Sequence, residues 1–155
     1  MEDLIGANTF DTTLLQRSDV IKISLQNVYG TVTVPDGVEF RIGQILRTQD
    51  GGETFESMTE TVWDAADPAA ALDAVVYHNG HIYTSLIADN AVEPGTDPAK
   101  WQDDGAWNAN GILAEHISLT QKAVVETMCT VVKRNLNGLE TGMLKTLFDN
   151  KIIAK

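Results

Sequence analysis

An asparagine–glycine pair between two β-rich runs constrains this chain more than any other local feature. Asn79-Gly80 separates residues 75–78 from residues 81–85, and both runs are rich in β-branched and aromatic side chains. Because a two-residue Asn-Gly loop matches the right-handed twist of paired strands, the pattern predicts a β-hairpin here. A proline-rich loop follows and ends at Trp101.

The segments on either side of this hairpin also show β periodicity. Alternating apolar residues predict strands over residues 20–34 and 38–46. Residues 123–133 are rich in Val and Thr and are also expected to form a strand. A further strand is expected over residues 111–119, and residues 102–109 are expected to be a polar connector. Apolar residues at helical spacing predict a helix that ends near Asn150, followed by a short terminal strand: Leu139, Met143, Leu144, Leu147 and Phe148, then Ile152 and Ile153.

These patterns divide the chain into three parts. Residues 20–57 and 108–155 are expected to form one compact β-rich body, residues 58–107 an inserted small hairpin module, and residues 1–19 an irregular N-terminal arm. An insertion at an exposed turn costs little free energy, because the inserted ends can lie close together. The expected fold class is mainly β, or α+β with one short C-terminal helix.

Composition narrows the functions that this chain can perform. A net charge of −11 opposes contact with nucleic-acid phosphates or with an anionic membrane. Apolar residues make up 43% of the chain, which is enough for a packed core. Residues 1–6 lack the basic start and long apolar run of a secretory signal, so synthesis in the cytoplasm is expected. The single cysteine, Cys129, is expected to be a buried apolar residue.

No catalytic pattern is visible in the sequence. The Ser-His-Asp and Cys-His signatures of nucleophilic enzymes are missing, so a small hydrolase is a distant alternative. His78 and His81 would face each other across the Asn-Gly turn, but no third ligand has suitable spacing for a metal. The many aspartates are expected to form a solvated surface, and neither a metal nor a cofactor is predicted.

Several motifs follow the order seen in the lambda type of head-decoration protein from tailed bacteriophages. They are an Arg-x-Gly-x-x-Leu step at 41–46, a Gly-Ile-Leu-Ala-Glu step at 111–115, a Val/Thr-rich strand at 124–132, an Asn-containing turn at 135–139, and a Leu-rich helix with an Ile-rich tail at 144–153. The chain resembles that family over residues near 20–50 and 110–155. It departs from the pattern in its long insert and in Val131-Val132-Lys133, where a glycine is common.

This resemblance implies a binding protein and not an enzyme. The expected partner is the major capsid protein on the outer surface of the assembled head, which a homotrimer would stabilise by bridging capsid subunits. The N-terminal segment typically contacts the shell in this family, so Phe10, Leu14 and Leu15 are expected to be apolar anchors of the arm. An extended arm can add a strand to an exposed sheet edge. The expected location is the outer surface of the virion capsid.

The insert resembles the small carbohydrate-binding modules attached to chitinases and cellulases. The shared pattern is an apolar strand, a glycine, an aromatic strand, a proline-rich loop and a closing tryptophan, here Trp101. A Gly-Asp pair usually precedes the first strand, and Leu72-Asp73 stands there instead. The alternative function is therefore a carbohydrate-binding protein or module that recognises cell-surface or wall glycans.

Aromatic faces bind sugar rings without charge, so aromatic residues of the insert are the candidate glycan ligands. Tyr83 and Trp101 are expected to be core residues, because a module this small needs its large aromatics inside. For Trp63, Tyr77 and Trp107, the sequence leaves both roles open, since period-2 alternation does not decide which face of a strand is covered.

Overall fold

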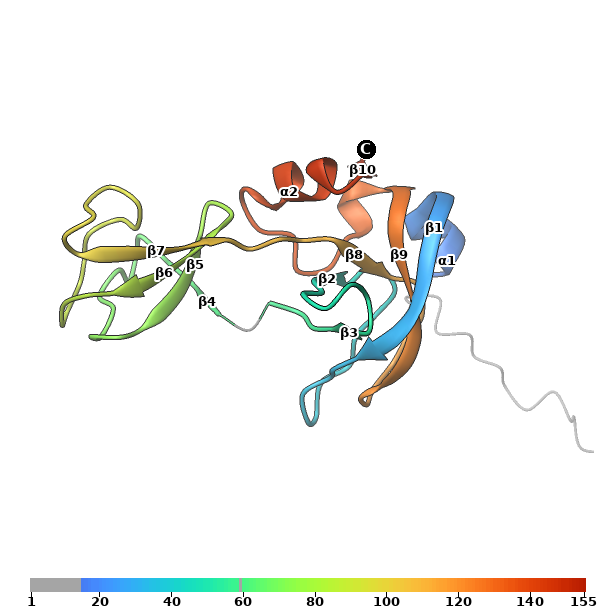
Figure 1. The fold of residues 1–155 in the computed structure, drawn as a ribbon, viewed down its shortest axis with the longest axis horizontal. Helices are drawn as coiled ribbons and strands as arrows, with labels where there is room; N and C mark the ends of the chain where they lie inside the picture. Colours follow the sequence, from blue (N-terminus) through green and yellow to red (C-terminus); the bar gives the residue numbers. More distant parts are fainter. Residues whose placement is uncertain (1–14, 59) are drawn as a thin grey trace, which may run out of the picture.

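The computed structural model describes residues 15–58 and 60–155, which form two β-sheets and one short C-terminal helix (Figure 1). The predicted mainly β fold class is confirmed. The sheet of the body has six strands: β1 (Ile21–Val32), β2 (Ile45–Leu46), β3 (Thr54–Phe55), β8 (Gly111–Leu113), β9 (Gln121–Val131) and β10 (Ile152–Ala154). The sheet of the insert has four: β4 (Thr61–Val62), β5 (Val75–His78), β6 (His81–Ser85) and β7 (Trp101–Ala106).

The body is organised around the long antiparallel pair β1 and β9. Their register runs from Ile21 opposite Val131 to Val32 opposite Gln121, so strands from before and after the insert share one sheet. On the far side of β9, β8 pairs antiparallel and β10 pairs parallel. On the far side of β1, β3 pairs only at its end. Within the described residues, most of β1 therefore has a neighbouring strand on one side only.

The predicted hairpin is confirmed, with β5 and β6 joined at Asn79-Gly80 and His78 opposite His81. The φ angles of Asn79 and Gly80 are 49° and 91°, and a tight I′ hairpin turn requires positive φ at both positions. β7 adds antiparallel to β6, and β4 adds parallel to β5. The four-stranded sheet spans residues 61–106, inside the predicted insert.

Within residues 15–58 and 60–155, helical structure is limited to three short segments: α1 (Arg17–Val20), the 3-10 turn η1 (Lys133–Asn135) and α2 (Met143–Asp149). The predicted C-terminal helix is confirmed in α2, with Asn150 as its C-cap residue. It begins four residues later than Leu139, because Gly142 at its N-cap has a φ of 92°, which is outside the helical region. The predicted terminal strand is confirmed in β10.

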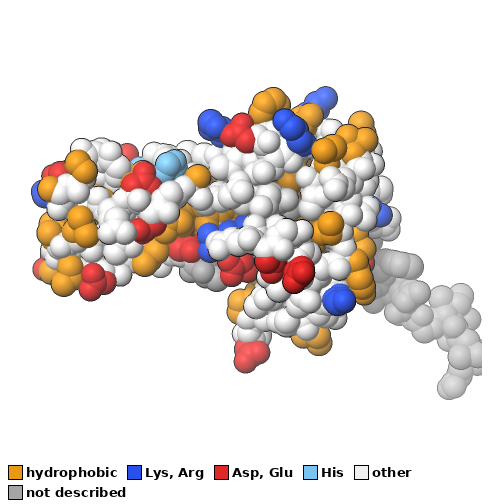
Figure 2. Space-filling view, in the orientation of Figure 1, with side chains coloured by type: hydrophobic (Ala, Val, Ile, Leu, Met, Phe, Trp, Pro, Cys, Tyr) orange, Lys and Arg blue, Asp and Glu red, His pale blue; other side chains and the backbone are white. Residues whose placement is uncertain are grey.

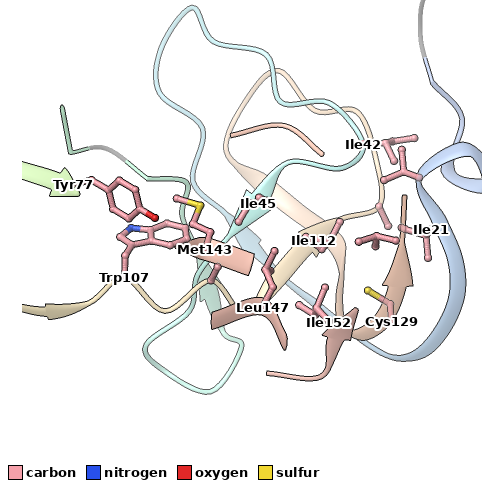
Figure 3. Packing of buried hydrophobic residues seen from close by; sticks show 14 residues of the cluster. Ile21, Ile42, Ile45, Tyr77, Trp107, Ile112, Cys129, Met143, Leu147 and Ile152 are labelled. Carbon is pink, nitrogen blue, oxygen red and sulfur yellow. The ribbon is translucent and has the colours of Figure 1, made fainter. Parts of the chain in front are cut away.

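Buried apolar side chains form two clusters in the body and one in the insert. The insert cluster contains Tyr83 and Trp101, which confirms their expected core role. Cys129 is also buried as expected, in the larger body cluster that Figure 3 shows. That cluster includes two aromatic residues of the insert, Tyr77 and Trp107, so it extends across the junction between insert and body.

Three predicted segments differ from the structure. The strand expected over residues 111–119 is reduced to β8, residues 111–113, and an isolated bridge at Ile117. Residues 102–109 were expected to be a connector, but β7 occupies residues 101–106. It is an edge strand whose side chains after Trp101 are mostly exposed, so it lacks the apolar alternation by which strands are detected. The strand expected over residues 38–46 is reduced to isolated bridges at Phe40 and Gln44 and the two-residue β2. Gly43, with a φ of 93°, interrupts the extended backbone between them.

The expected arm is shorter than residues 1–19, because α1 already belongs to the body. Arg17 forms an ion pair with Glu126 of β9, whose side chain is fully buried. The hydroxyl of Ser24 donates a second hydrogen bond to the same carboxylate, at 2.6 Å. A buried charge is stable only when it is paired and hydrogen-bonded, so this contact fixes residues 17–20 against the sheet.

Candidate functional site

Tyr77 and Trp107 are both buried, at 1% and 0% exposure, and this corrects their predicted role in glycan binding. A sugar ring needs an open aromatic face, and neither side chain has one. Figure 3 shows both rings beside Met143 of α2. The physical reason is that the body covers this end of the insert sheet, which strand alternation alone does not reveal.

Hydrogen bonds reinforce this junction between insert and body. The Tyr77 hydroxyl donates to the Thr141 carbonyl of the body at 2.8 Å. Within the insert, the Trp107 backbone N–H donates to the Gly80 carbonyl at 2.8 Å and so holds the Trp107 backbone beside the hairpin turn. Burial, together with the nearby charge of Glu140, raises the pKa of the Tyr77 phenol to about 12. The hydroxyl therefore stays protonated and remains a donor at neutral pH.

Arg47 of the body lies beside the same junction. Its guanidinium is 5.5 Å from the centre of the Trp107 ring, within the range of a cation–π contact. It also pairs with Glu56 at 2.9 Å and with Glu60 at 3.5 Å. Glu60 lies where the chain enters the insert, and Trp107 lies where it leaves. Because Arg47 contacts both residues, these contacts help to hold the insert against the body.

Of the three glycan candidates, Trp63 alone is only partly buried. It lines a groove of about 330 Å³ with Asp64, Asp67 and a wall of small apolar residues. Trp63 also lines a second hollow of about 210 Å³, together with His78 and Glu140. Its indole N–H has no hydrogen-bond partner among the described residues. That N–H is buried, so the side chain offers the groove an aromatic surface next to carboxylates, and such a surface is suited to a sugar ring.

The histidines across the hairpin turn are engaged separately. His78 lies 3.0 Å from a Glu93 carboxylate oxygen, and its ring packs edge-on against Trp63 at 4.9 Å between centroids. His81 lies 3.0 Å from both carboxylate oxygens of Asp103. Within residues 15–58 and 60–155, no three His, Cys, Asp or Glu side chains are grouped so that they could hold a metal ion.

Of the three predicted arm anchors, Phe10 and Leu14 lie outside the described residues. Leu15 is described and exposed, and its carbonyl oxygen lies 3.0 Å from His116 Nε2. His116 in turn lines a hollow of about 250 Å³ with Phe40 and Ile117. The arm therefore joins the body next to a partly apolar depression.

An apolar row on β1 was not recognised as a site from the sequence. Ile23, Leu25 and Tyr29 are 53%, 70% and 65% exposed, although they lie on a central pair of the sheet. Alternation in this segment predicts a strand, but it does not show whether the apolar side chains are covered. Exposed apolar side chains on a strand with a free edge are typical of protein-binding surfaces. We call these three residues the β1 row.

No family model, no curated protein and no solved structure matches this chain, so comparison with known proteins does not assign it to a family. None of the helices in the described ranges is long and apolar enough to cross a membrane.

Proposed function

We propose that this chain is a bacteriophage capsid-decoration protein, which binds the outer surface of the assembled head and stabilises it by bridging capsid subunits. The observation that supports the proposal is the β1 row, an exposed apolar surface on a strand edge close to the start of the described residues. An extended segment of a shell protein can add to such an edge through main-chain hydrogen bonds. The order of motifs resembles that of the decoration family, and this resemblance is the reason to propose a phage capsid as the partner.

The proposed mechanism is thermodynamic and involves no chemical step. A specific interface buries a total area of about 1,200–2,000 Å², and the β1 row would lie at its centre. A ligand that binds only the assembled head stabilises that head by mass action, by RT ln(1 + [L]/Kd) for each site.

The test uses phage heads that lack this protein. The wild-type chain is expected to co-sediment with heads and to raise the temperature at which they release DNA. Leu25→Asp and Tyr29→Asp are expected to weaken binding at least about tenfold, because a charge is placed in an apolar contact. Leu119→Asp is the matched control, because Leu119 is 58% exposed but lies outside the β1 row.

Deleting residues 1–14 tests the proposed arm without disturbing the body. The deletion leaves Arg17 and its ion pair with Glu126 in place, so the truncated chain should fold with unchanged circular dichroism and bind heads more weakly. Full binding by the Leu25 and Tyr29 variants would refute the role of the β1 row. Full binding by the truncated chain would refute the role of the arm.

A second function, glycan binding by the insert, is favoured by the groove at Trp63. Retention on chitin or peptidoglycan is expected for the wild-type chain and is expected to fall for Trp63→Ala. Leu72→Ala is the control, because Leu72 is exposed on the insert outside that groove. Equal retention of both variants would exclude Trp63 as the contact.

A further inference from the structure

Charge is distributed unevenly along this acidic chain. Residues 58–107 contain nine acidic side chains and a single basic one, Lys100. Residues 133–155 contain five basic side chains and two acidic ones. In Figure 2, Lys and Arg side chains accordingly gather over α2 and β10, whereas Asp and Glu are scattered over the insert. The molecule therefore has one basic region and one acidic region.

The basic region has an apolar centre, which we call the α2 face. Phe148 is 63% exposed, and Leu144, one helical turn before it, is also exposed on the same side of α2. Ile153 of the adjacent strand β10 is exposed as well. Basic side chains surround this centre: Lys145, which pairs with Asp149, and the exposed Lys151 and Lys155.

The acidic region also has an apolar centre, at the end of the insert farthest from the body. The hairpin turn packs against Gly142 of the body, so the opposite ends of β5 and β6 form the free end. Three exposed apolar residues lie there: Leu72, Leu86 and Ile87. They are accompanied by the exposed Asp73 and Asp89 and by the partly buried Lys100. We call this set the distal tip.

We propose that the distal tip of one copy binds the α2 face of a second copy. The two surfaces are complementary in both respects, since each has an apolar centre and their surrounding charges have opposite sign. They cannot meet within one molecule. The buried junction at Tyr77 and Trp107 holds the insert pointing away from the body, with the tip at one end of the molecule (Figure 1).

Such a contact is head-to-tail, because two different surfaces of the same chain meet. Repetition therefore closes into a ring when the rotation between copies permits it, and otherwise extends into a chain. Binding combines burial of Phe148 and Leu86 with attraction between lysines and aspartates. Association is expected to weaken as salt is raised, because exposed charge pairs are screened over about 8–10 Å at physiological ionic strength.

Two single substitutions test the contact from its two sides. Phe148→Asp places a negative charge opposite the acidic tip, and Leu86→Lys places a positive charge opposite the basic face. Both residues are exposed, at 63% and 42%, so both variants should fold. In sedimentation velocity, the wild-type chain is expected to self-associate with increasing concentration, and each variant is expected to lose at least about tenfold in association constant.

Mixing the two variants provides the decisive measurement. Phe148→Asp retains an intact tip and Leu86→Lys retains an intact α2 face, so one native contact can form between them. The mixture is expected to give a complex at concentrations where neither variant associates alone, and Leu119→Asp is expected to behave as wild type. Three results would each overturn the proposal. The wild-type chain could stay monomeric, the substitutions could leave self-association unchanged, or the mixture of the two variants could form no complex. These measurements are made without phage heads, so they are independent of the shell-binding test.

Discussion

At the scale of single residues, Asp50 organises the loop before β3. Its carboxylate accepts hydrogen bonds from the hydroxyl and the backbone N–H of Thr54, from the hydroxyl of Thr48, and from the backbone N–H of Glu53. The Thr54 hydroxyl, followed by the Thr54 N–H and the Thr48 hydroxyl, holds the pKa of Asp50 well below its usual value. These bonds favour the ionised form, so they stabilise the loop only while Asp50 is charged.

Asp50→Ala is therefore expected to lower the free energy of unfolding at pH 7. Because the folded-state pKa is depressed, the contribution of Asp50 is complete above its unfolded-state pKa of about 3.9 and is lost as the pH falls toward the folded-state value. The difference between wild type and variant should shrink from pH 7 to pH 3 in urea titrations.

Asp36→Ala is the control for this effect. Asp36 is exposed in a turn and makes no side-chain hydrogen bond with the described residues, so its removal should change the free energy of unfolding little at either pH. A difference at Asp50 that does not depend on pH would show that the hydrogen bonds to the carboxylate are not its source.

At the scale of elements, the contact between the hairpin turn and the N-terminus of α2 fixes the insert to the body. A Cβ atom on Gly142 would lie 2.4 Å from the Asn79 carbonyl carbon, and the φ of Gly142 is 92°. Gly142→Ala is therefore expected to lower the free energy of unfolding by about 2–4 kcal/mol, from backbone strain and overpacking together. Urea titration followed by circular dichroism measures this loss.

Gly105→Ala separates the two causes. Gly105 has a similar φ of 103°, but no atom lies within 4 Å of the position of an added Cβ. Only backbone strain should act there, with a loss of about 1–2 kcal/mol. Equal losses at the two positions would mean that the close approach of the turn to α2 contributes nothing to stability.

At the scale of the whole molecule, insert and body are expected to unfold together. Trp107 of the insert and Cys129 of the body belong to one apolar cluster, so separating the insert would remove a buried aromatic from the body core. Such a loss costs about 3–5 kcal/mol, which is a large share of the stability of an ordinary domain. Tryptophan fluorescence and the exposure of Cys129 should therefore change at the same urea concentration.

Cys129 is suited to report on the body in this experiment. Burial, together with the charge of Glu126, raises the pKa of its thiol to about 12, so the thiol should not react until the body opens. Trp101→Leu, which disturbs only the insert core, should lower both midpoints by the same amount. A fluorescence change that precedes thiol labelling would mean that the insert unfolds on its own.

Strand β5 illustrates why the sequence predicted the fold better than the site. Its hairpin was predictable because Asn79 and Gly80 adopt positive φ for local steric reasons. Val76 and Tyr77, however, are adjacent residues on opposite faces, and both are buried. Val76 packs in the insert core and Tyr77 packs in the body core, so β5 is covered on both faces, which no alternation pattern indicates.

The β1 row is the opposite case, in which the sequence does not show that apolar side chains on a strand are exposed. Ile23, Leu25 and Tyr29 gave the expected strand, yet their side chains are exposed, because no other part of the described chain packs on them. Apolar periodicity identifies a strand, but it does not state whether a partner lies above it.

The sequence by itself determined the local conformations: the Asn-Gly hairpin, the C-terminal helix before Asn150, and the mainly β class, since these depend on φ preferences and side-chain periodicity within a few residues. Only the tertiary structure decided that Tyr77 and Trp107 join the insert to the body, and that Trp63 and the β1 row remain open. Burial depends on which distant segment covers a face, as residues 141–143 cover Tyr77, and such contacts leave no signal in the neighbouring sequence.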